Sequence, residues 1–284
     1  MSQEKNVYQF RGGSKYVLDE ELARIVNVSM ALEMPLLLKG EPGTGKTMLA
    51  HAIAESLKMP LIVLNVKSSM KLIDALYQYD TLTRLNDSRF GDSKRDVSNI
   101  EDYIKMGKIG QAFTADTRTI LLIDEIDKAD TDFQDDMLDV LDQMQFDIIE
   151  IDKTMTARHR PVIVITSNAK KDLSDPFLGR CNFHHIAFPD QEMMRRIVNV
   201  HFPNLSDEML DACIAAFYRI REFKGIEKKP ATRELINWIR ALKTDPDFRV
   251  RALEKGETPF LGILFKKSND LQMATQQAAR SSLR

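Results

Sequence analysis

The sequence has few cysteines, no excess of charge of one sign and no long apolar run. Its two cysteines, Cys181 and Cys213, are far apart and lack a CxxC spacing, which favours a reducing compartment. The formal net charge of −2 gives no whole-chain field that would favour nucleic acid or a membrane surface. The first residues, MSQEKNVYQF, lack the apolar core of a signal peptide, and no run approaches the roughly 20 apolar residues that span a bilayer. These absences predict a cytoplasmic protein with no membrane partner, in which any polyanion partner would need a local basic patch.

Short apolar runs divide the chain into two predicted domains. Four runs, each next to a stretch long enough for a helix, are LLLKG, LIVLNV, TILLID and VIVIT, which begin at Leu36, Leu61, Thr119 and Val162. This alternation predicts a parallel sheet in an α/β domain. Beyond FHHIAFPD, residues 183–190, the strand signal disappears, and helices are predicted around residues 193–200, 208–220 and 232–242. We therefore expect an α/β domain at residues 1–188 and a small all-helical domain with a polar C-terminal tail at 189–284.

The segment GEPGTGKT, which begins at Gly40, fits the phosphate-binding pattern G-x-x-x-x-G-K-[ST]. A predicted strand ends at Leu38 and a predicted helix begins at Lys46, so backbone N–H groups at the helix N-terminus would point at the phosphates. Lys46 would reach the β and γ phosphates of ATP, and the Thr47 hydroxyl would coordinate Mg²⁺. The predicted nucleotide-binding residues of this segment are Gly40, Glu41, Pro42, Gly43, Thr44, Gly45, Lys46, Thr47 and Met48.

A second motif, ILLIDEIDKA, places two carboxylates just after a predicted strand. Asp124 and Glu125 would lie at the carboxyl edge of the sheet, where open α/β sheets bind their ligands. Asp124 is expected to bind nucleotide through Mg²⁺, directly or through water. Glu125 is expected to polarise the attacking water as general base. The acidic residues that follow are expected to form a solvated helix start rather than further ligands; they are Asp127, Asp130, Asp132, Asp135 and Asp136.

These two motifs, together with three later segments, resemble those of AAA+ ATPases. VIVITSN ends at Asn168, where the family carries a sensor residue that orients the attacking water. DPFLGRCNFHHIAFP resembles the element that bears an arginine finger, which implies that role for Arg180, although Gly179 stands where many relatives carry a second arginine. KPATRELINWIRAL resembles the second sensor motif and implies that Arg233 contacts the γ-phosphate. The resemblance implies a P-loop NTPase fold, a parallel sheet sandwiched by helices, followed by a small all-helical lid domain.

Within AAA+ proteins the chain looks most like the MoxR type. The long connection between the second strand and Asp124, which includes KLIDALYQYDTLTRLNDSRFGD, looks like the helix-2 insert of that clade, although a long surface loop is an alternative. FDIIEIDKTMTARHRPVIVIT reads as two short strands around DKT, like the clade's pre-sensor hairpin. Asn65 has two equal interpretations: a polar switch that holds Glu125 back, or a residue that caps a turn.

The resemblance implies an ATP-hydrolysing, chaperone-like ATPase that remodels a partner protein. An arginine finger supplied by a neighbour implies a ring of subunits, six by resemblance. MoxR-type proteins often act on clients or adaptors with a von Willebrand factor A domain, and the sequence does not name the client. Two other functions are considered: a nucleic-acid-acting AAA+ motor, which the near-neutral charge disfavours, and a nucleotide-regulated scaffold, which would not need Glu125, Asn168 and Arg180.

Overall fold

The computed structural model describes residues 9–90, 95–168, 171 and 173–281. The chain forms two compact units. The first consists of Met1–Ser14, Leu18–Gly40 and Lys46–Ile186, and the second of Lys15–Val17, Glu41–Gly45 and Ala187–Arg284.

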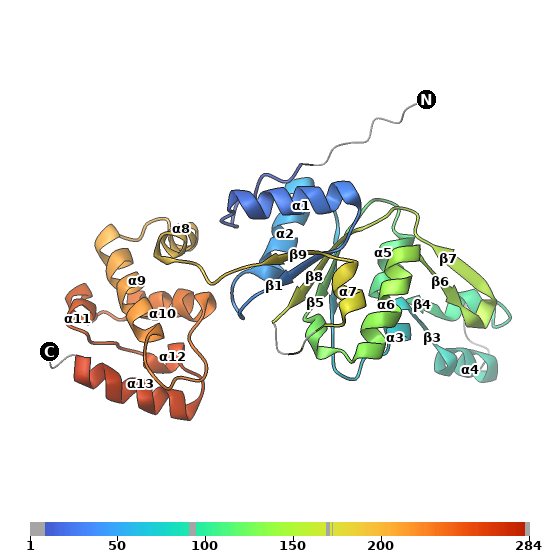
Figure 1. Ribbon diagram of the computed structural model, residues 1–284. Helices are drawn as coiled ribbons and strands as arrows, with labels where there is room; N and C mark the ends of the chain where they lie inside the picture. The colour runs from blue at the N-terminus through green and yellow to red at the C-terminus, as the bar shows by residue number, and fades with distance from the viewer. Residues whose placement is uncertain (1–8, 91–94, 169–170, 172, 282–284) are drawn as a thin grey trace. The chain divides into compact units, whose positions relative to one another are not determined.

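A five-stranded sheet is the centre of the first unit (Figure 1). Its strands lie in the order β2-β5-β8-β1-β9 and all pair in parallel. Their bounds are β1 Leu36–Lys39, β2 Leu61–Asn65, β5 Ile120–Asp124, β8 Val162–Ser167 and β9 Asn182–His185. The predicted parallel sheet is therefore confirmed. β8 is buried at every residue, as expected for a strand covered on both faces.

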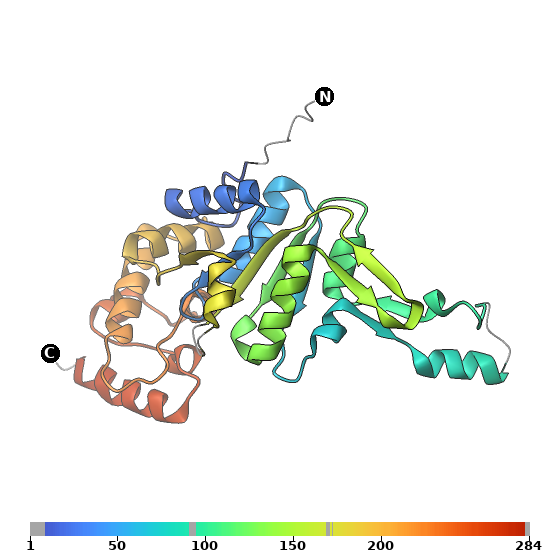
Figure 2. The ribbon, with the colours of Figure 1, turned by 45° about the vertical axis from the view of Figure 1, so that its right-hand side comes forward.

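Helices flank this sheet (Figures 1 and 2). The larger ones are α1 Glu20–Leu32, α2 Lys46–Leu57, α5 Lys108–Thr114 and α6 Thr131–Gln143, and α7, Asp175–Gly179, is a short one before β9. Asp19 begins α1 as its N-cap and accepts a hydrogen bond from the Leu22 N–H at 2.7 Å. Asp130 begins α6 in the same way by accepting from the Phe133 N–H at 2.9 Å. These local caps fix where the helices start relative to the strand ends.

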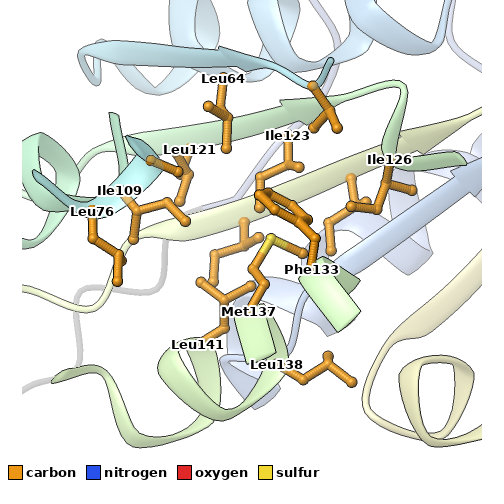
Figure 3. Close-up of a cluster of buried hydrophobic side chains, with 14 of the residues drawn as sticks. Leu64, Leu76, Ile109, Leu121, Ile123, Ile126, Phe133, Met137, Leu138 and Leu141 are labelled. Atoms are coloured by element: carbon orange, nitrogen blue, oxygen red, sulfur yellow. The ribbon is translucent and has the colours of Figure 1, made fainter. Parts of the chain in front are cut away.

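One face of the sheet packs against α5 and α6 (Figure 3). Alternate residues of β5, Leu121 and Ile123, point into this cluster because side chains along a strand alternate between its two faces. Phe133 and Met137, one turn apart on α6, fill the space against them. All four side chains are almost fully buried, so α6 is fixed rigidly against the strand that ends at Asp124.

Smaller elements occupy the connections of the first unit. Between β2 and β5 lie α3 Leu72–Leu76, β3 Tyr77–Tyr79, α4 Thr81–Phe90, η1 Ile100–Tyr103 and β4 Ile104–Met106, with β3 and β4 antiparallel. The connection thus contains defined elements and is not one long loop, although part of the predicted insert, Gly91 and Asp92, lies outside the described residues. η2 is Ile126–Lys128. Ahead of β8, β6 Gln145–Ile148 and β7 Lys153–Thr156 pair antiparallel around η3 Ile149–Ile151.

From Ala187 on, the described residues form helices and connecting segments. The helices are α8 Gln191–His201, α9 Asp207–Arg221, α10 Thr232–Thr244, α11 Val250–Glu254, α12 Leu261–Leu264 and α13 Ser268–Ser281. Phe217 and Trp238 lie at the centre of their core, and the Trp238 indole N–H donates to the Pro259 carbonyl at 2.7 Å. The predicted C-terminal helical region is confirmed. Its polar last segment is the helix α13, which buries Ala274. Among the described helices, none is both long and apolar enough to cross a membrane.

Candidate functional site

The glycine-rich loop connects the end of β1 to the start of α2. Gly43 and Gly45 have φ angles of +83° and +92°, a backbone conformation that is strained for residues with a side chain. The Lys46 side chain is buried, and its Nζ donates to the Gly40 carbonyl at 2.9 Å. Thr44 Oγ1 donates to the Glu41 carbonyl at 3.0 Å. The glycines therefore allow a tight loop, and the buried ammonium group lies at the base of that loop.

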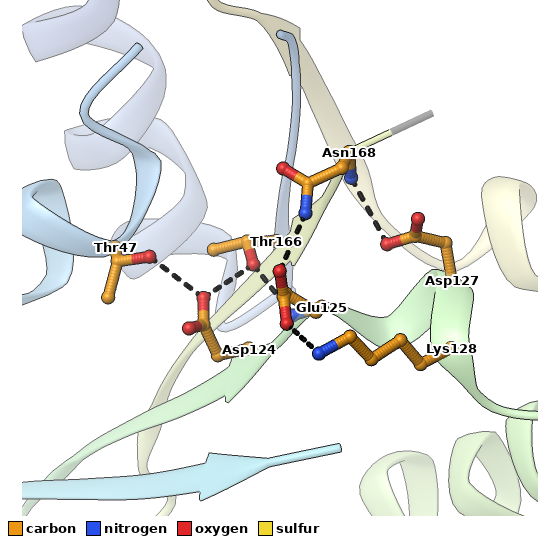
Figure 4. Close-up of polar contacts among 7 residues, drawn as sticks. All are labelled: Thr47, Asp124, Glu125, Asp127, Lys128, Thr166 and Asn168. Atoms are coloured by element: carbon orange, nitrogen blue, oxygen red, sulfur yellow. Dashed lines mark hydrogen bonds and ion pairs between the residues drawn. The ribbon is translucent and has the colours of Figure 1, made fainter. Parts of the chain in front are cut away.

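Asp124 accepts hydrogen bonds from two threonines (Figure 4). Thr47 Oγ1, at the start of α2, lies 2.9 Å from Asp124 Oδ1. Thr166 Oγ1, on β8, lies 2.7 Å from the same oxygen and also accepts the Glu125 N–H at 2.9 Å. One buried hydroxyl thus fixes both the Asp124 carboxylate and the backbone of Glu125.

Glu125 sits in a left-handed backbone conformation, with φ 61° and ψ 51°. Such a conformation is uncommon for a residue with a side chain, and strained residues cluster at functional sites. Its Oε1 accepts from Asn168 Nδ2 at 2.9 Å, and its Oε2 forms an ion pair with Lys128 (Figure 4). The hydrogen bond to Glu125 and the nearby carboxylate charge raise the pKa of Lys128, so this lysine stays protonated. Both carboxylate oxygens of Glu125 are therefore oriented by cationic or amide donors.

Asp127 differs from its predicted role. We expected a solvated residue at a helix start, but Asp127 is only 3% exposed, and its Oδ1 accepts the Asn168 N–H at 3.1 Å. The prediction for this residue was wrong because it lies one turn after β5, against the end of β8. Asp130, by contrast, is the N-cap of α6, and Asp132 and Asp136 are exposed on that helix.

The sequence interpretation missed three residues of this network: Thr166, Asp127 and Lys128. For Thr166 a signal exists: it lies near the end of β8 and two residues before Asn168, which follows the strand, and residues two apart in extended chain point to the same side. For Lys128 the spacing of three after Glu125 is a helical one, and it brings the two side chains together. Nothing in the local sequence distinguishes Asp127, which is buried, from the exposed aspartates that follow it.

Replacing Thr166 by valine tests how much this hydroxyl contributes. Valine has the same shape but cannot accept the Glu125 N–H, and an orphaned buried donor costs about 1–3 kcal/mol. We expect Thr166→Val to lower the free energy of unfolding by that amount in urea denaturation. Thr156→Val, at an exposed position of β7, is the matched control and should change stability by less than about 0.5 kcal/mol. Equal stability of the two variants would show that the Thr166 hydroxyl is not needed for this network.

Asn65 is adjacent to the site but does not hold Glu125. It ends β2 in register with Asp124 and is exposed. Among the described residues, the side-chain partners of Glu125 are Asn168 and Lys128, and a bond from Asn65 is not seen. In this structure the amide that contacts Glu125 is therefore that of Asn168 and not that of Asn65.

The two arginines predicted from the later segments lie in different units of the chain. Arg180 follows α7, just before β9, and its Nε donates to Asp142 Oδ2 at 2.7 Å. Arg233 lies in the first turn of α10 in the second unit and is exposed. Within the first unit, the structure brings the Lys46 ammonium group next to the Gly40 carbonyl. Separately, it joins Thr47, Asp124, Glu125 and Asn168 in one hydrogen-bonded network. Arg180 bonds to Asp142 and to the Pro176 carbonyl, and neither belongs to that network.

The sequence profile of the ATPase family associated with various cellular activities (AAA) matches residues 36–189, more than half of the chain. The chain belongs to this family. As an AAA protein it is an ATPase and binds nucleotide. The matched range runs from β1 to the residues just after β9, and so contains the glycine-rich loop, the network around Glu125 and Arg180.

Solved structures show that the AAA fold extends over nearly the whole chain. A mutant of RuvB from Thermotoga maritima aligns with a TM-score of 0.51 and 15% sequence identity. The alignment covers 92% of this chain and 71% of that chain. At this identity the likeness shows the fold alone. A search among curated proteins finds no match.

Proposed function

We propose that this AAA ATPase is a MoxR-type protein that hydrolyses ATP with Mg²⁺ and uses the energy to remodel a partner protein in the cytoplasm. Its hydrolytic part is residues 1–188, and residues 189–284 form the lid. The observation that carries the proposal is the bonded network around Glu125. A protein that only stored nucleotide would not need a carboxylate held between Asn168 and Lys128, one residue after a likewise bonded aspartate.

Mg²⁺ fits the oxygen atoms at Thr47 and Asp124. Their hydroxyl and carboxylate oxygens already lie 2.9 Å apart, and Mg²⁺ prefers oxygen ligands, using one or two protein groups together with phosphate oxygens and water. Bound Mg²⁺ would neutralise charge on the β and γ phosphates. Lys46 would leave the Gly40 carbonyl for these phosphates, because a phosphate is the stronger acceptor for an ammonium group.

Glu125 is proposed as the general base of hydrolysis. A carboxylate can take the proton of the attacking water only if its oxygen is aimed at that water. The left-handed turn at Glu125 and the Asn168 amide fix the direction of the side chain. We propose that Asn168 orients the same water, which is the role that its sequence position implies.

The position of Arg180 supports its role as an arginine finger for a neighbouring subunit. The Asn182 N–H donates to the Pro35 carbonyl at 2.8 Å, so Arg180 lies near the amino ends of β9 and β1. Glu125 and Asn168 follow the carboxyl ends of β5 and β8. Four-residue strands separate the two edges of the sheet by about 10 Å or more. Arg180 thus lies near the edge of the sheet opposite the one that Glu125 and Asn168 follow, which favours action on a neighbouring subunit in a ring, six-membered by resemblance.

The lid and the partner protein complete the proposal. Arg233 of the lid would contact the γ-phosphate, and nucleotide state would then change the arrangement of the lid. The β3-β4 and β6-β7 sheets correspond in sequence position to the proposed helix-2 insert and pre-sensor hairpin, which support the MoxR assignment. A protein with a von Willebrand factor A domain is the proposed client or adaptor. The test is whether such a protein, encoded next to this chain, raises its ATPase rate; unchanged rates with it would contradict this assignment.

The ATPase rate should not respond to DNA or RNA. The chain has a formal net charge of −2, so no general attraction to phosphate backbones is expected. The measurement is ATPase rate with and without duplex DNA, single-stranded DNA and RNA at 50 and 200 mM salt. Binding through about six phosphate contacts would weaken by roughly 10³ between these salt concentrations. Stimulation with that salt dependence would indicate a nucleic-acid motor instead.

A further inference from the structure

The Arg180 side chain is held in one orientation by two acceptors. Its Nε donates to Asp142 Oδ2 at 2.7 Å, and its Nη1 donates to the Pro176 carbonyl at 3.3 Å. An arginine has further N–H donors in the same plane, and these stay available for the oxygens of a phosphate. The side chain is 41% exposed. The guanidinium is thus oriented from one edge and accessible from another.

The segment that carries Arg180 is attached to α6 at both of its ends. At its start, Ser174 Oγ donates to Asp135 Oδ1 at 2.8 Å, and at its end Arg180 bonds to Asp142. Asp135 and Asp142 lie two turns apart on one face of α6, which is the spacing that such a double attachment needs. Between them Phe177 is fully buried in the core that α6 also lines. The backbone of the segment is therefore fixed by packing, and Asp142 fixes the side chain.

Stability alone gives little reason for the pair between Arg180 and Asp142. Both side chains are close to half exposed, 41% and 46%, and exposed ion pairs contribute little to folding. Holding a long arginine in one rotamer costs conformational entropy. A pair that orders the side chain in advance is therefore useful where the guanidinium must bind a ligand in one fixed orientation. Removing the Asp142 carboxylate should therefore leave the fold intact and free the Arg180 side chain.

We propose that Asp142 is the positioning residue of Arg180: its carboxylate orients the guanidinium toward the ATP bound to the neighbouring subunit. This inference rests on the proposed role of Arg180 as a finger. Without Asp142 the guanidinium must be ordered at each encounter with the phosphate. The conformational entropy that is lost when one such side chain is ordered corresponds to a decrease in rate of about 3- to 10-fold.

The first experiment uses rings of a single variant. We expect Asp142→Ala to lower kcat for ATP by about 3- to 10-fold with an unchanged affinity for ATP, because the loop around Lys46 is untouched. Asp142→Asn keeps an acceptor oxygen and should lose less. Asp136→Ala is the matched control: it removes the same charge from an exposed position on another face of α6 and should keep the wild-type rate. An Asp142→Ala rate equal to or above wild type would overturn the proposal, since a raised rate would mean that Asp142 restrains Arg180.

The second experiment asks on which chain Asp142 acts. An Arg180→Ala chain can hydrolyse ATP only with a finger from a neighbour, and a Lys46→Ala chain can supply that finger without hydrolysing. We expect Asp142→Ala to reduce the activity of this mixture when it is added to the Lys46→Ala chain, and to have no effect when added to the Arg180→Ala chain. A loss in the second case alone would show that Asp142 serves its own site, which contradicts the proposal.

These results also separate the two proposals. If Arg180→Ala rings hydrolyse ATP at the wild-type rate, the finger assignment fails and the role of Asp142 fails with it. If Arg180→Ala rings are inactive while Asp142→Ala rings are normal, the finger assignment stands and only the role of Asp142 is wrong. Thermal unfolding of both variants, expected to match wild type, excludes a loss that comes from misfolding.

Discussion

Glu125→Gln should bind ATP as tightly as the unmodified chain and hydrolyse it about 10²- to 10⁴-fold more slowly, the usual contribution of a general base. Glutamine keeps the length of the side chain and still offers an oxygen to the Asn168 amide, which bonds Glu125 at 2.9 Å. What it lacks is the charge that accepts a proton from water. The loss should therefore appear in kcat and not in nucleotide affinity.

The measurement combines ATP binding with single-turnover hydrolysis. Asp132→Asn, which removes a carboxylate from the exposed first turn of α6, is the matched control and should hydrolyse normally. Lys46→Ala provides the opposite pattern, since it should lose binding first. A Glu125→Gln chain that turned over ATP at the normal rate would show that Glu125 is not the base, and the network around it would then need another explanation.

The sheet and the loop could be predicted from sequence because their signals are local. VIVIT is apolar at successive positions, and the strand it predicts, β8, is buried at every residue. GEPGTGKT carries glycines at the two positions where the backbone has positive φ, Gly43 and Gly45. Each of these features depends on residues that are neighbours in the chain. A single sequence therefore contains the information that is needed to predict them.

The polar network around Glu125 was only half predictable because it depends on two strands meeting. The sequence points to Asp124 and Glu125 at the end of β5, and to Asn168 just after β8. The bonds from Thr166 to Asp124 and from Asn168 to Asp127 require the particular register in which β5 and β8 pair. Apolar patterns predict that the strands pair, but not which polar atoms come within hydrogen-bond distance. The same reason explains why Asp142 was not linked to Arg180, which is far from it in sequence.

Arg180→Ala should bind ATP almost normally and lose most of its hydrolysis, by about 10³- to 10⁵-fold, the range that arginine fingers contribute. The physical reason is charge: a guanidinium is needed where the γ-phosphate passes through its transition state. Arg180 lies near the amino ends of the strands, and its side chain is bound by Asp142 and the Pro176 carbonyl. It is therefore expected to act on the ATP of a neighbouring chain rather than on its own.

Mixing two inactive variants distinguishes action on a neighbour from action within one chain. A Lys46→Ala chain cannot bind nucleotide but still offers its own Arg180, and an Arg180→Ala chain has an intact nucleotide site but no finger. In a mixed ring, an interface where Lys46→Ala presents its Arg180 to an Arg180→Ala neighbour contains one complete site. Activity should therefore return in part, because only mixed interfaces of one orientation are complete.

The readout is ATPase rate against mixing ratio, after conditions in which subunit exchange has been shown directly with labelled chains. If the finger acts across the interface, the rate should rise from near zero at either end to a maximum at an intermediate ratio. If exchange is complete and no ratio restores activity, each chain must supply its own Arg180 or the finger lies elsewhere. Arg180→Lys is the informative companion variant, since it keeps the positive charge but lacks the planar fork that can bond Asp142 and a phosphate at once. We expect Arg180→Lys to recover only a small part of the rate that Arg180→Ala loses. A lysine ammonium group bound to Asp142 has no second set of donors that reaches the phosphate of the neighbouring chain.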